Sequence, residues 1–144
     1  MFLLPLVDTL DTVTIDVRGI AQPKGSTRAF NIPGLKAPVI TSANPKLKDW
    51  QHAVQRAAGL KCRQVLTGPI LVTIAFQLPR PKSRKKTRHH TTKPDLDKLI
   101  RAINDALTGT AYRDDSQITA IQASKHYCDG DELPGCVIWL DAVV

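Results

Sequence analysis

Residues 93–108 read KPDLDKLIRAINDALT, the clearest helical pattern in the chain. Apolar residues recur there at positions i, i+3, i+4, i+7, i+10 and i+11, which places them on one face of an α-helix. These residues are Leu96, Leu99, Ile100, Ile103, Ala106 and Leu107. The pattern predicts a helix from about Leu96 to Thr108 that ends near Gly109.

Outside this helix, apolar patterns predict four strands and a second helix. Strands are expected at residues 13–17, 70–78, 117–127 and 136–140. The second helix is expected from the cap Asn44–Pro45 to about Gly59, and residues 19–41, rich in Pro, Gly and Ser, are expected to form a long loop. The last strand should pair with its predecessor as a hairpin. The expected fold is a single α+β domain over residues 1–144, with two main helices and a mixed sheet in the order β-α-β-α-β-β.

The positive charge of the chain is concentrated in one segment, residues 80–93. The whole chain carries a net charge of +7. This segment has no Asp or Glu, and its basic residues alone account for that charge: Arg80, Lys82, Arg84, Lys85, Lys86, Arg88 and Lys93. Such a concentration favours contact with a polyanion such as DNA over a loop that is merely solvated. We expect a mobile loop that becomes ordered on its partner.

Two pairs of carboxylates flank the predicted helix, Asp95 with Asp97 and Asp114 with Asp115. The second pair can reach the first only if the chain turns back along a helix of roughly 18 Å. Converging carboxylates repel one another, and a hard divalent cation such as Mg²⁺, or Mn²⁺ in its place, relieves the repulsion. Such a metal would serve phosphodiester hydrolysis. Spacing alone leaves a second interpretation open, in which the acids are a helix cap and a polar turn.

Arg101 lies four residues after Asp97 and four before Asp105, on the polar side of the helix. It could form a salt bridge with Asp97, or it could contact the phosphate that is cut. Asp105 could simply anchor Arg101.

Several classes of protein and site are excluded by the sequence. The three cysteines, Cys62, Cys128 and Cys136, have a spacing that fits neither a disulfide framework nor a zinc site. No apolar run approaches the roughly 20 residues of a membrane span, and the N-terminus lacks the basic start of a signal peptide. We expect a cytoplasmic protein.

Three motifs, KPDLDKL at 93–99, NDALTG at 104–109 and YRDDSQI at 112–118, resemble those of the RusA-type Holliday junction resolvases. The family pattern is close to K-P-D-L-D-N-L, D-A-L and D-D-x-Q-[VI], in this order and spacing. Residues 22–26, QPKGS, also resemble the family's loop after the first strand. The resemblance covers about residues 12 to 127.

The resemblance implies a homodimeric, Mg²⁺-dependent endonuclease that cuts two opposed strands of a four-way DNA junction. The essential carboxylates would be Asp95, Asp97 and Asp115, with Asp114 as a further candidate metal ligand. Arg101 would complete the catalytic residues, although it replaces a family lysine and cannot lose its proton. A two-fold dimer suits the two-fold related strands of a junction.

The same resemblance and the charge pattern predict where DNA is held and where the protein acts. The expected DNA-binding residues are Lys24, Arg28, Arg84, Lys85, Lys86, Arg88, Lys93 and Lys125. The expected setting is the cytoplasm of a bacterium, for a protein of bacterial or phage origin. The alternatives are another Mg²⁺-dependent nuclease for branched DNA and a basic DNA-binding protein without catalytic activity.

Overall fold

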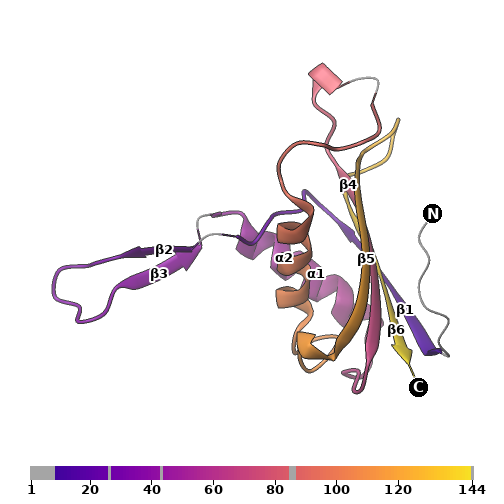
Figure 1. Cartoon of the computed structure of the whole chain (residues 1–144), viewed down its shortest axis with the longest axis horizontal. Helices are drawn as coiled ribbons and strands as arrows, with labels where there is room; N and C mark the ends of the chain where they lie inside the picture. Colours follow the sequence, from indigo (N-terminus) through magenta and orange to yellow (C-terminus); the bar gives the residue numbers. More distant parts are fainter. Residues whose placement is uncertain (1–8, 26, 43, 85–86, 144) are drawn as a thin grey trace.

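A four-stranded mixed sheet carries both helices on one of its faces (Figure 1). The computed structural model of the protein describes residues 9–25, 27–42, 44–84 and 87–143. The strands of the main sheet are β1 (Thr9–Arg18), β6 (Gly135–Val143), β4 (Ile70–Leu78) and β5 (Ile118–Tyr127), in that spatial order. Strand β6 is antiparallel to β1 and β4, whereas β4 and β5 are parallel. The predicted α+β class with two helices and a mixed sheet is confirmed.

The position of β6 corrects the expected hairpin between the last two strands. Strand β6 pairs with β1 and β4, and β5 pairs with β4 alone within the described sheet. The helix between β4 and β5 acts as a crossover, so β5 arrives parallel to β4 on its outer side. The other side of β4 is then left for β6.

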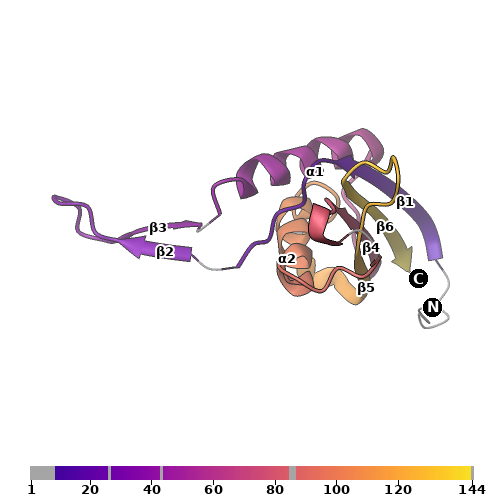
Figure 2. The ribbon, with the colours of Figure 1, turned by 90° about the horizontal axis from the view of Figure 1, so that it is seen from above.

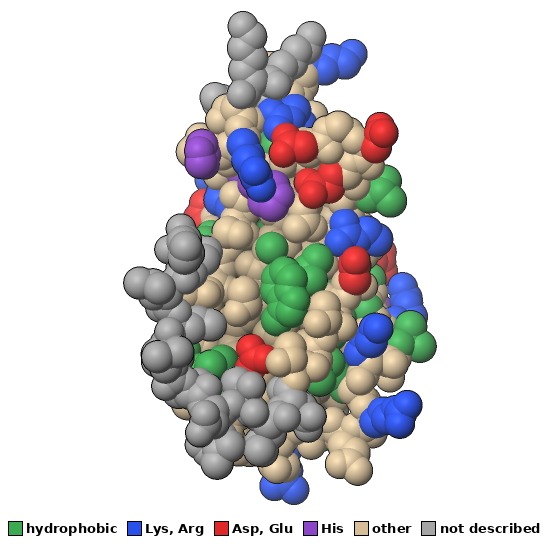
Figure 3. All heavy atoms as spheres, turned by 90° about the vertical axis from the view of Figure 1, so that its right-hand side faces the viewer, with side chains coloured by type: hydrophobic (Ala, Val, Ile, Leu, Met, Phe, Trp, Pro, Cys, Tyr) green, Lys and Arg blue, Asp and Glu red, His purple; other side chains and the backbone are tan. Residues whose placement is uncertain are grey.

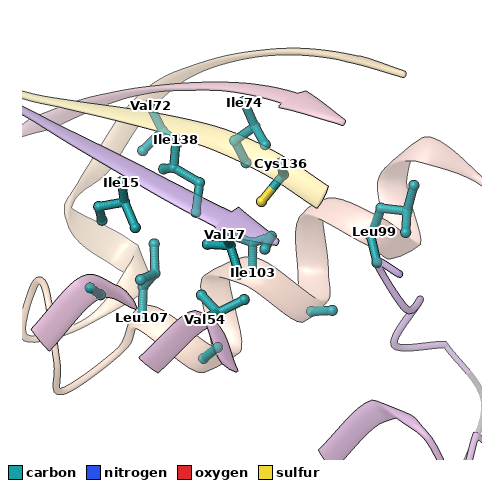
Figure 4. Close-up of a cluster of buried hydrophobic side chains, with 14 of the residues drawn as sticks. Ile15, Val17, Val54, Val72, Ile74, Leu99, Ile103, Leu107, Cys136 and Ile138 are labelled. Carbon is teal, nitrogen blue, oxygen red and sulfur yellow. The ribbon is translucent and has the colours of Figure 1, made fainter. Parts of the chain in front are cut away.

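Helices α1 (Leu47–Lys61) and α2 (Leu96–Leu107) pack side by side against the sheet (Figure 2). Their apolar faces meet alternate side chains of the strands in one core, which includes Ile15, Val54, Ile103 and Ile138 (Figure 4). The predicted helix at residues 96–108 is confirmed. The other helix begins later than expected: Asn44 closes a turn before it, where its carbonyl accepts the backbone N–H of Leu47 at 3.2 Å.

The expected long loop at residues 19–41 is wrong in its second half, which forms a hairpin. Strands β2 (Thr27–Phe30) and β3 (Val39–Ser42) pair antiparallel and project away from the body of the molecule (Figures 1 and 2). At its tip the Leu35 N–H donates to the Ile32 carbonyl at 3.0 Å, and Gly34 has a φ of 91°. This is a turn with Pro at its first central position and Gly at its second, where a positive φ is required.

Among the described residues, neither α1 nor α2 covers the opposite face of the main sheet (Figure 1), which Figure 3 shows from the front. Hydrophobic side chains lie in the middle of this face, and charged and histidine side chains gather near one end of it. Trp139, which alternates with the buried Ile138 and Leu140, is half-buried there. Within the described residues, no helix is long and apolar enough to cross a membrane.

Candidate active site

The first carboxylate pair lies at the start of α2 and is exposed to solvent. Asp95 is the N-cap residue in extended conformation, but its side chain makes no capping hydrogen bond. Its Oδ2 instead lies 3.5 Å from the Nζ of Lys98. Asp97 follows in the first turn, and its carboxylate has no ion pair or hydrogen bond with any residue that the structure describes. Helix capping therefore does not account for the two acids.

Lys125 at the end of β5 fixes the segment that leads into Asp95. Its Nζ donates to the carbonyls of Thr92 and Pro94, each at 2.8 Å. The ammonium group thus ties the chain before α2 to the sheet, and so helps to set where the Asp95 carboxylate lies. This positioning role was not anticipated from the sequence, and a contact between Lys125 and DNA stays a prediction.

Arg80, at the other end of the basic segment, is held by the fold. Its guanidinium donates to the carbonyls of Cys128, at 3.1 Å, and of Thr87. It also pairs with the Asp129 carboxylate at 2.9 Å and lies over the ring of Tyr127 at 5.2 Å. One of the seven positive charges of residues 80–93 is therefore engaged in contacts within the protein.

Among the described side chains of residues 80–93, that of His90 is buried. It is 8% exposed, and its ring centroid lies 4.7 Å from that of Tyr127. Within the described residues its Nδ1 has no hydrogen-bond partner. Burial, and secondly the charge of Lys125, lower the pKa of His90 below its ordinary value. The His90 side chain is therefore packed inside the protein and is not accessible to a DNA phosphate.

We expect the stability of the protein to fall as the pH drops below about 6.5, because His90 gains a proton more readily in the unfolded chain. Its pKa is lowered in the folded state, so the unfolded state binds more protons in this range and folding loses free energy. Urea midpoints measured between pH about 7.5 and about 5.5 should decline less in His90→Leu than in the wild type. The exposed His52→Leu on α1 is the matched control and should keep the wild-type slope. Equal slopes for all three proteins would contradict the assignment.

The second carboxylate pair lies in the turn that precedes β5. The backbone N–H of Asp114 donates to Oε1 of Gln117 at 2.9 Å, and the Ser116 hydroxyl donates to Oδ2 of Asp114 at 2.5 Å. The Ser116 hydrogen bond lowers the pKa of Asp114. The amide of Gln117 ties the turn to the carbonyls of residues 66 and 68, at 3.1 and 2.9 Å. Asp114 is thus engaged in its own turn, whereas Asp115 is simply exposed.

Tyr112 is buried beside this turn, where its hydroxyl lies 3.3 Å from the carbonyl of Asn104. Burial raises the pKa of Tyr112 strongly, and the negative charges of Asp115, Asp105 and Asp114 raise it further. The C-terminal end of α2 and the turn after it therefore form a region of negative potential.

The two carboxylate pairs lie at opposite ends of α2 (Figure 1). A helix of 12 residues is roughly 18 Å long. Strand β5 begins beside Asp115 and runs back, so that its far end, at Lys125, is the end that lies near Asp95. In the described part of the chain, no three acidic, histidine or cysteine side chains are grouped to hold a metal ion. One chain places Asp95 and Asp97 at one end of α2 and Asp115 at the other.

Arg101 stands exposed between the two pairs, in the middle of α2. Asp105, the residue that might have anchored it, pairs instead with Nζ of Lys24 at 2.9 Å and accepts from Nε2 of Gln51 at 3.0 Å. The backbone N–H of Lys24 donates to the carbonyl of Lys98 at 2.9 Å. Arg101 itself makes no hydrogen bond or ion pair with the described residues. Its guanidinium is therefore available to a ligand.

The expected DNA-binding residues fall into three groups. Arg88 and Lys93 are exposed on the segment before α2. Lys24 and Lys125 are engaged with the protein as described above. The others are Lys85 and Lys86, which lie outside the described residues, and Arg28 and Arg84, whose side chains do.

Comparison with known proteins points to one family. A family model described as "Endodeoxyribonuclease RusA" matches residues 21–139 of the 144. Both carboxylate pairs, Arg101 and Lys125 lie within this range. The chain is also similar to "Uncharacterized protein YqaN" of Bacillus subtilis (strain 168), with 34% identity over 90 residues. That match covers 55% of this chain and 63% of the relative, so the chain spans less than two thirds of the relative's length.

Proposed function

Because the chain belongs to the RusA family of endodeoxyribonucleases, we propose that it resolves four-way (Holliday) DNA junctions by paired, Mg²⁺-dependent hydrolysis of phosphodiesters. The observation that carries the proposal is the start of α2. Asp95 and Asp97 are both exposed there, and the Asp95 side chain makes no capping hydrogen bond. Exposed carboxylates can hold Mg²⁺, and a basic segment beside them can hold the DNA phosphates.

Asp95 and Asp97 would hold the metal. Protein sites for Mg²⁺ commonly supply one or two carboxylates, with substrate phosphate oxygens and water as the other ligands, and the pair fits that pattern. When bound, Mg²⁺ or Mn²⁺ would polarise the phosphate and lower the pKa of a bound water. Arg101 stands one helical turn beyond Asp97, where its N–H groups can donate to a phosphate oxygen. Its charge neutralises the phosphate without any proton transfer, which suits a residue that stays protonated.

The third carboxylate, Asp115, would come from a second copy of the chain. Strand β5 has a neighbour, β4, on one side, and residues 118–125 have no strand partner on the other side within the described sheet. An unpaired edge of this length is a ready site for another strand. If two β5 strands paired antiparallel about a two-fold axis, the Asp115 end of one would lie beside the Lys125 end of the other. Asp95 and Asp97 are near that Lys125 end.

Charge favours the same arrangement of two chains. The turn before β5 carries Asp114 and Asp115, and Lys125 lies near the far end of the strand. Antiparallel self-pairing therefore sets opposite charges against each other at both ends of the contact. Each site in the proposed homodimer would contain Asp95 and Asp97 from one chain and Asp115 from the other, with two sites for the two strands of a junction.

The DNA would be held through its backbone. Arg88 and Lys93 are exposed near the start of α2, and Lys85, Lys86, Arg84 and Arg28 would extend the basic surface. Phosphate contacts of this kind position DNA without reading its sequence. We place the protein in the cytoplasm of a bacterium, of bacterial or phage origin, where such junctions arise.

The test is cleavage of an immobile four-way junction, compared with a linear duplex that has the same arm sequences. With Mg²⁺ we expect paired nicks near the branch point of the junction, little cutting of the duplex, and none of either with EDTA. Equal cutting of the duplex would favour a less selective nuclease. Binding of the junction without cutting, in both Mg²⁺ and Mn²⁺, would favour a non-catalytic DNA-binding protein.

A further inference from the structure

A cavity of about 410 Å³ opens directly beside Asp95. It lies between the segment that leaves β1 and the segment that enters α2, at the base of the β2–β3 hairpin. Its lining includes Ile20, Gln22, Pro23, Asn44, Pro94 and Asp95. The cavity thus shares a wall with the proposed metal site.

The lining is apolar on both sides and charged at Asp95 and two lysines. Ile20 and Pro23 come from one segment and Pro94 from the other. Ile20 is 57% exposed, so its side chain is accessible to a ligand. Lys93 and Lys98 also line the cavity. A phosphate suits the lysines but not the apolar walls, whereas a nucleotide, with a flat apolar base and an anionic backbone, suits both.

A fixed amide inside the cavity offers a donor and an acceptor together. The Nδ2 of Asn44 donates to Oε1 of Gln22 at 3.0 Å, and Nε2 of Gln22 donates to the Ile20 carbonyl at 3.2 Å. An amide group has two donor hydrogens and two acceptor lone pairs. Among the described contacts, Gln22 therefore keeps one N–H and one lone pair for a ligand. Paired donors and acceptors of this kind recognise the edge of a base.

Both walls of the cavity are held in place before any ligand arrives. Backbone hydrogen bonds join the Gly19 N–H to the Pro134 carbonyl at 3.0 Å and the Lys24 N–H to the Lys98 carbonyl at 2.9 Å. Lys125 fixes the opposite wall through Thr92 and Pro94. A preformed pocket binds with less loss of conformational entropy than one that must be assembled.

We propose that this cavity takes an unstacked nucleobase of the nucleotide next to the phosphate that Asp95 serves. The inference rests on the proposed nuclease function and gives that site a means of reading a base. Ile20, Pro23 and Pro94 cover the faces of the base, Gln22 meets its edge, and Lys93 and Lys98 hold the adjoining phosphates. Base pairs at a branch point lack a continuous stack, so opening one there takes less free energy than in duplex DNA.

The test uses junctions that carry 2-aminopurine, in turn, at each nucleotide beside the branch point, bound by the protein in EDTA so that no strand is cut. At one position the fluorescence should rise several-fold on binding, because the base leaves the stack. Ile20→Ser should lose this rise while junction affinity changes by less than about 3-fold, since affinity comes mainly from the backbone. Leu60→Ser, an exposed substitution on α1, is the matched control and should keep the rise.

Cleavage supplies the second readout. With Mg²⁺, varying the base at the responsive position should change the wild-type rate by about 10-fold, and Gln22→Ala should remove most of that difference. Thermal unfolding should show that both variants are folded. The inference is overturned if the wild type binds and cuts junctions but no position responds, or if the response persists in both Ile20→Ser and Gln22→Ala. If the wild type cuts no junction at all, the proposed function fails first and this inference fails with it.

Discussion

Replacing Asp97 by asparagine should lower Mg²⁺-dependent cutting of a four-way junction by on the order of 1,000-fold, the scale of losing one main electrostatic contributor to catalysis. The side chain is exposed and makes no described contact within the protein, so the change should leave the fold intact. Junction binding should stay equal or become tighter, because a negative charge close to the DNA phosphates is removed. Gel shift and single-turnover cleavage on the same junction measure the two effects separately.

The matched control is Asp131→Asn, which neutralises an exposed acid in the turn between β5 and β6. It changes the net charge by the same amount at a site with no proposed role, so its cutting rate should equal that of the wild type. Cutting by Asp97→Asn at a rate near that of the wild type would refute the assignment of Asp97 as a metal ligand.

Mixing two inactive variants should restore cutting if each site is built from two chains. Asp97→Asn and Asp115→Asn should each be inactive as pure homodimers. In a heterodimer, one site collects both substitutions and the other collects neither. About half of the dimers in an equal, freely exchanging mixture would be such heterodimers. They should nick one strand of a junction without making the paired cut.

A mixture that stays inactive would contradict a site shared between two chains. If all the carboxylates of a site came from one chain, every heterodimer would carry one damaged carboxylate in each site and the mixture would stay inactive. Asp97→Asn mixed with a second preparation of Asp97→Asn is the control for exchange and should show no activity. Size-exclusion chromatography with light scattering, before and after mixing, establishes that the chains form dimers and exchange.

Local patterns in the sequence predicted where helices and strands occur better than they predicted which strands pair. The helix at residues 96–107 follows from a single apolar face, and its observed end differs from the prediction by one residue. The hairpin was missed because Pro and Gly were interpreted as signs of a loop, although Pro33–Gly34 between residues 27–30 and 39–42 is also a turn signal. The place of β6 depends on which side of β4 is left free, and no local pattern contains that information.

In the candidate site, too, local features could be predicted and contacts between distant segments could not. Spacing identified Asp95 and Asp97 as a pair, and the structure places both at the exposed start of α2. Spacing could not show that Lys24 pairs with Asp105, or that Lys125 holds the chain before Asp95, because these contacts join segments that are distant in sequence. A basic side chain looks alike in a sequence whether it binds DNA or braces the fold. Only the three-dimensional neighbours distinguish the two.

A nuclease with the proposed two-chain site would stay inert in the cell while the protein is scarce. Each chain carries one acid pair at either end of α2, and the proposed site needs one end from each of two chains. Below the dissociation constant of the dimer, cutting would then rise with the square of the chain concentration, by mass action. A modest change in expression would produce a much larger change in DNA cleavage. Because the length of α2 separates the two acid pairs within one chain, activity would depend on whether the protein is abundant enough to form dimers.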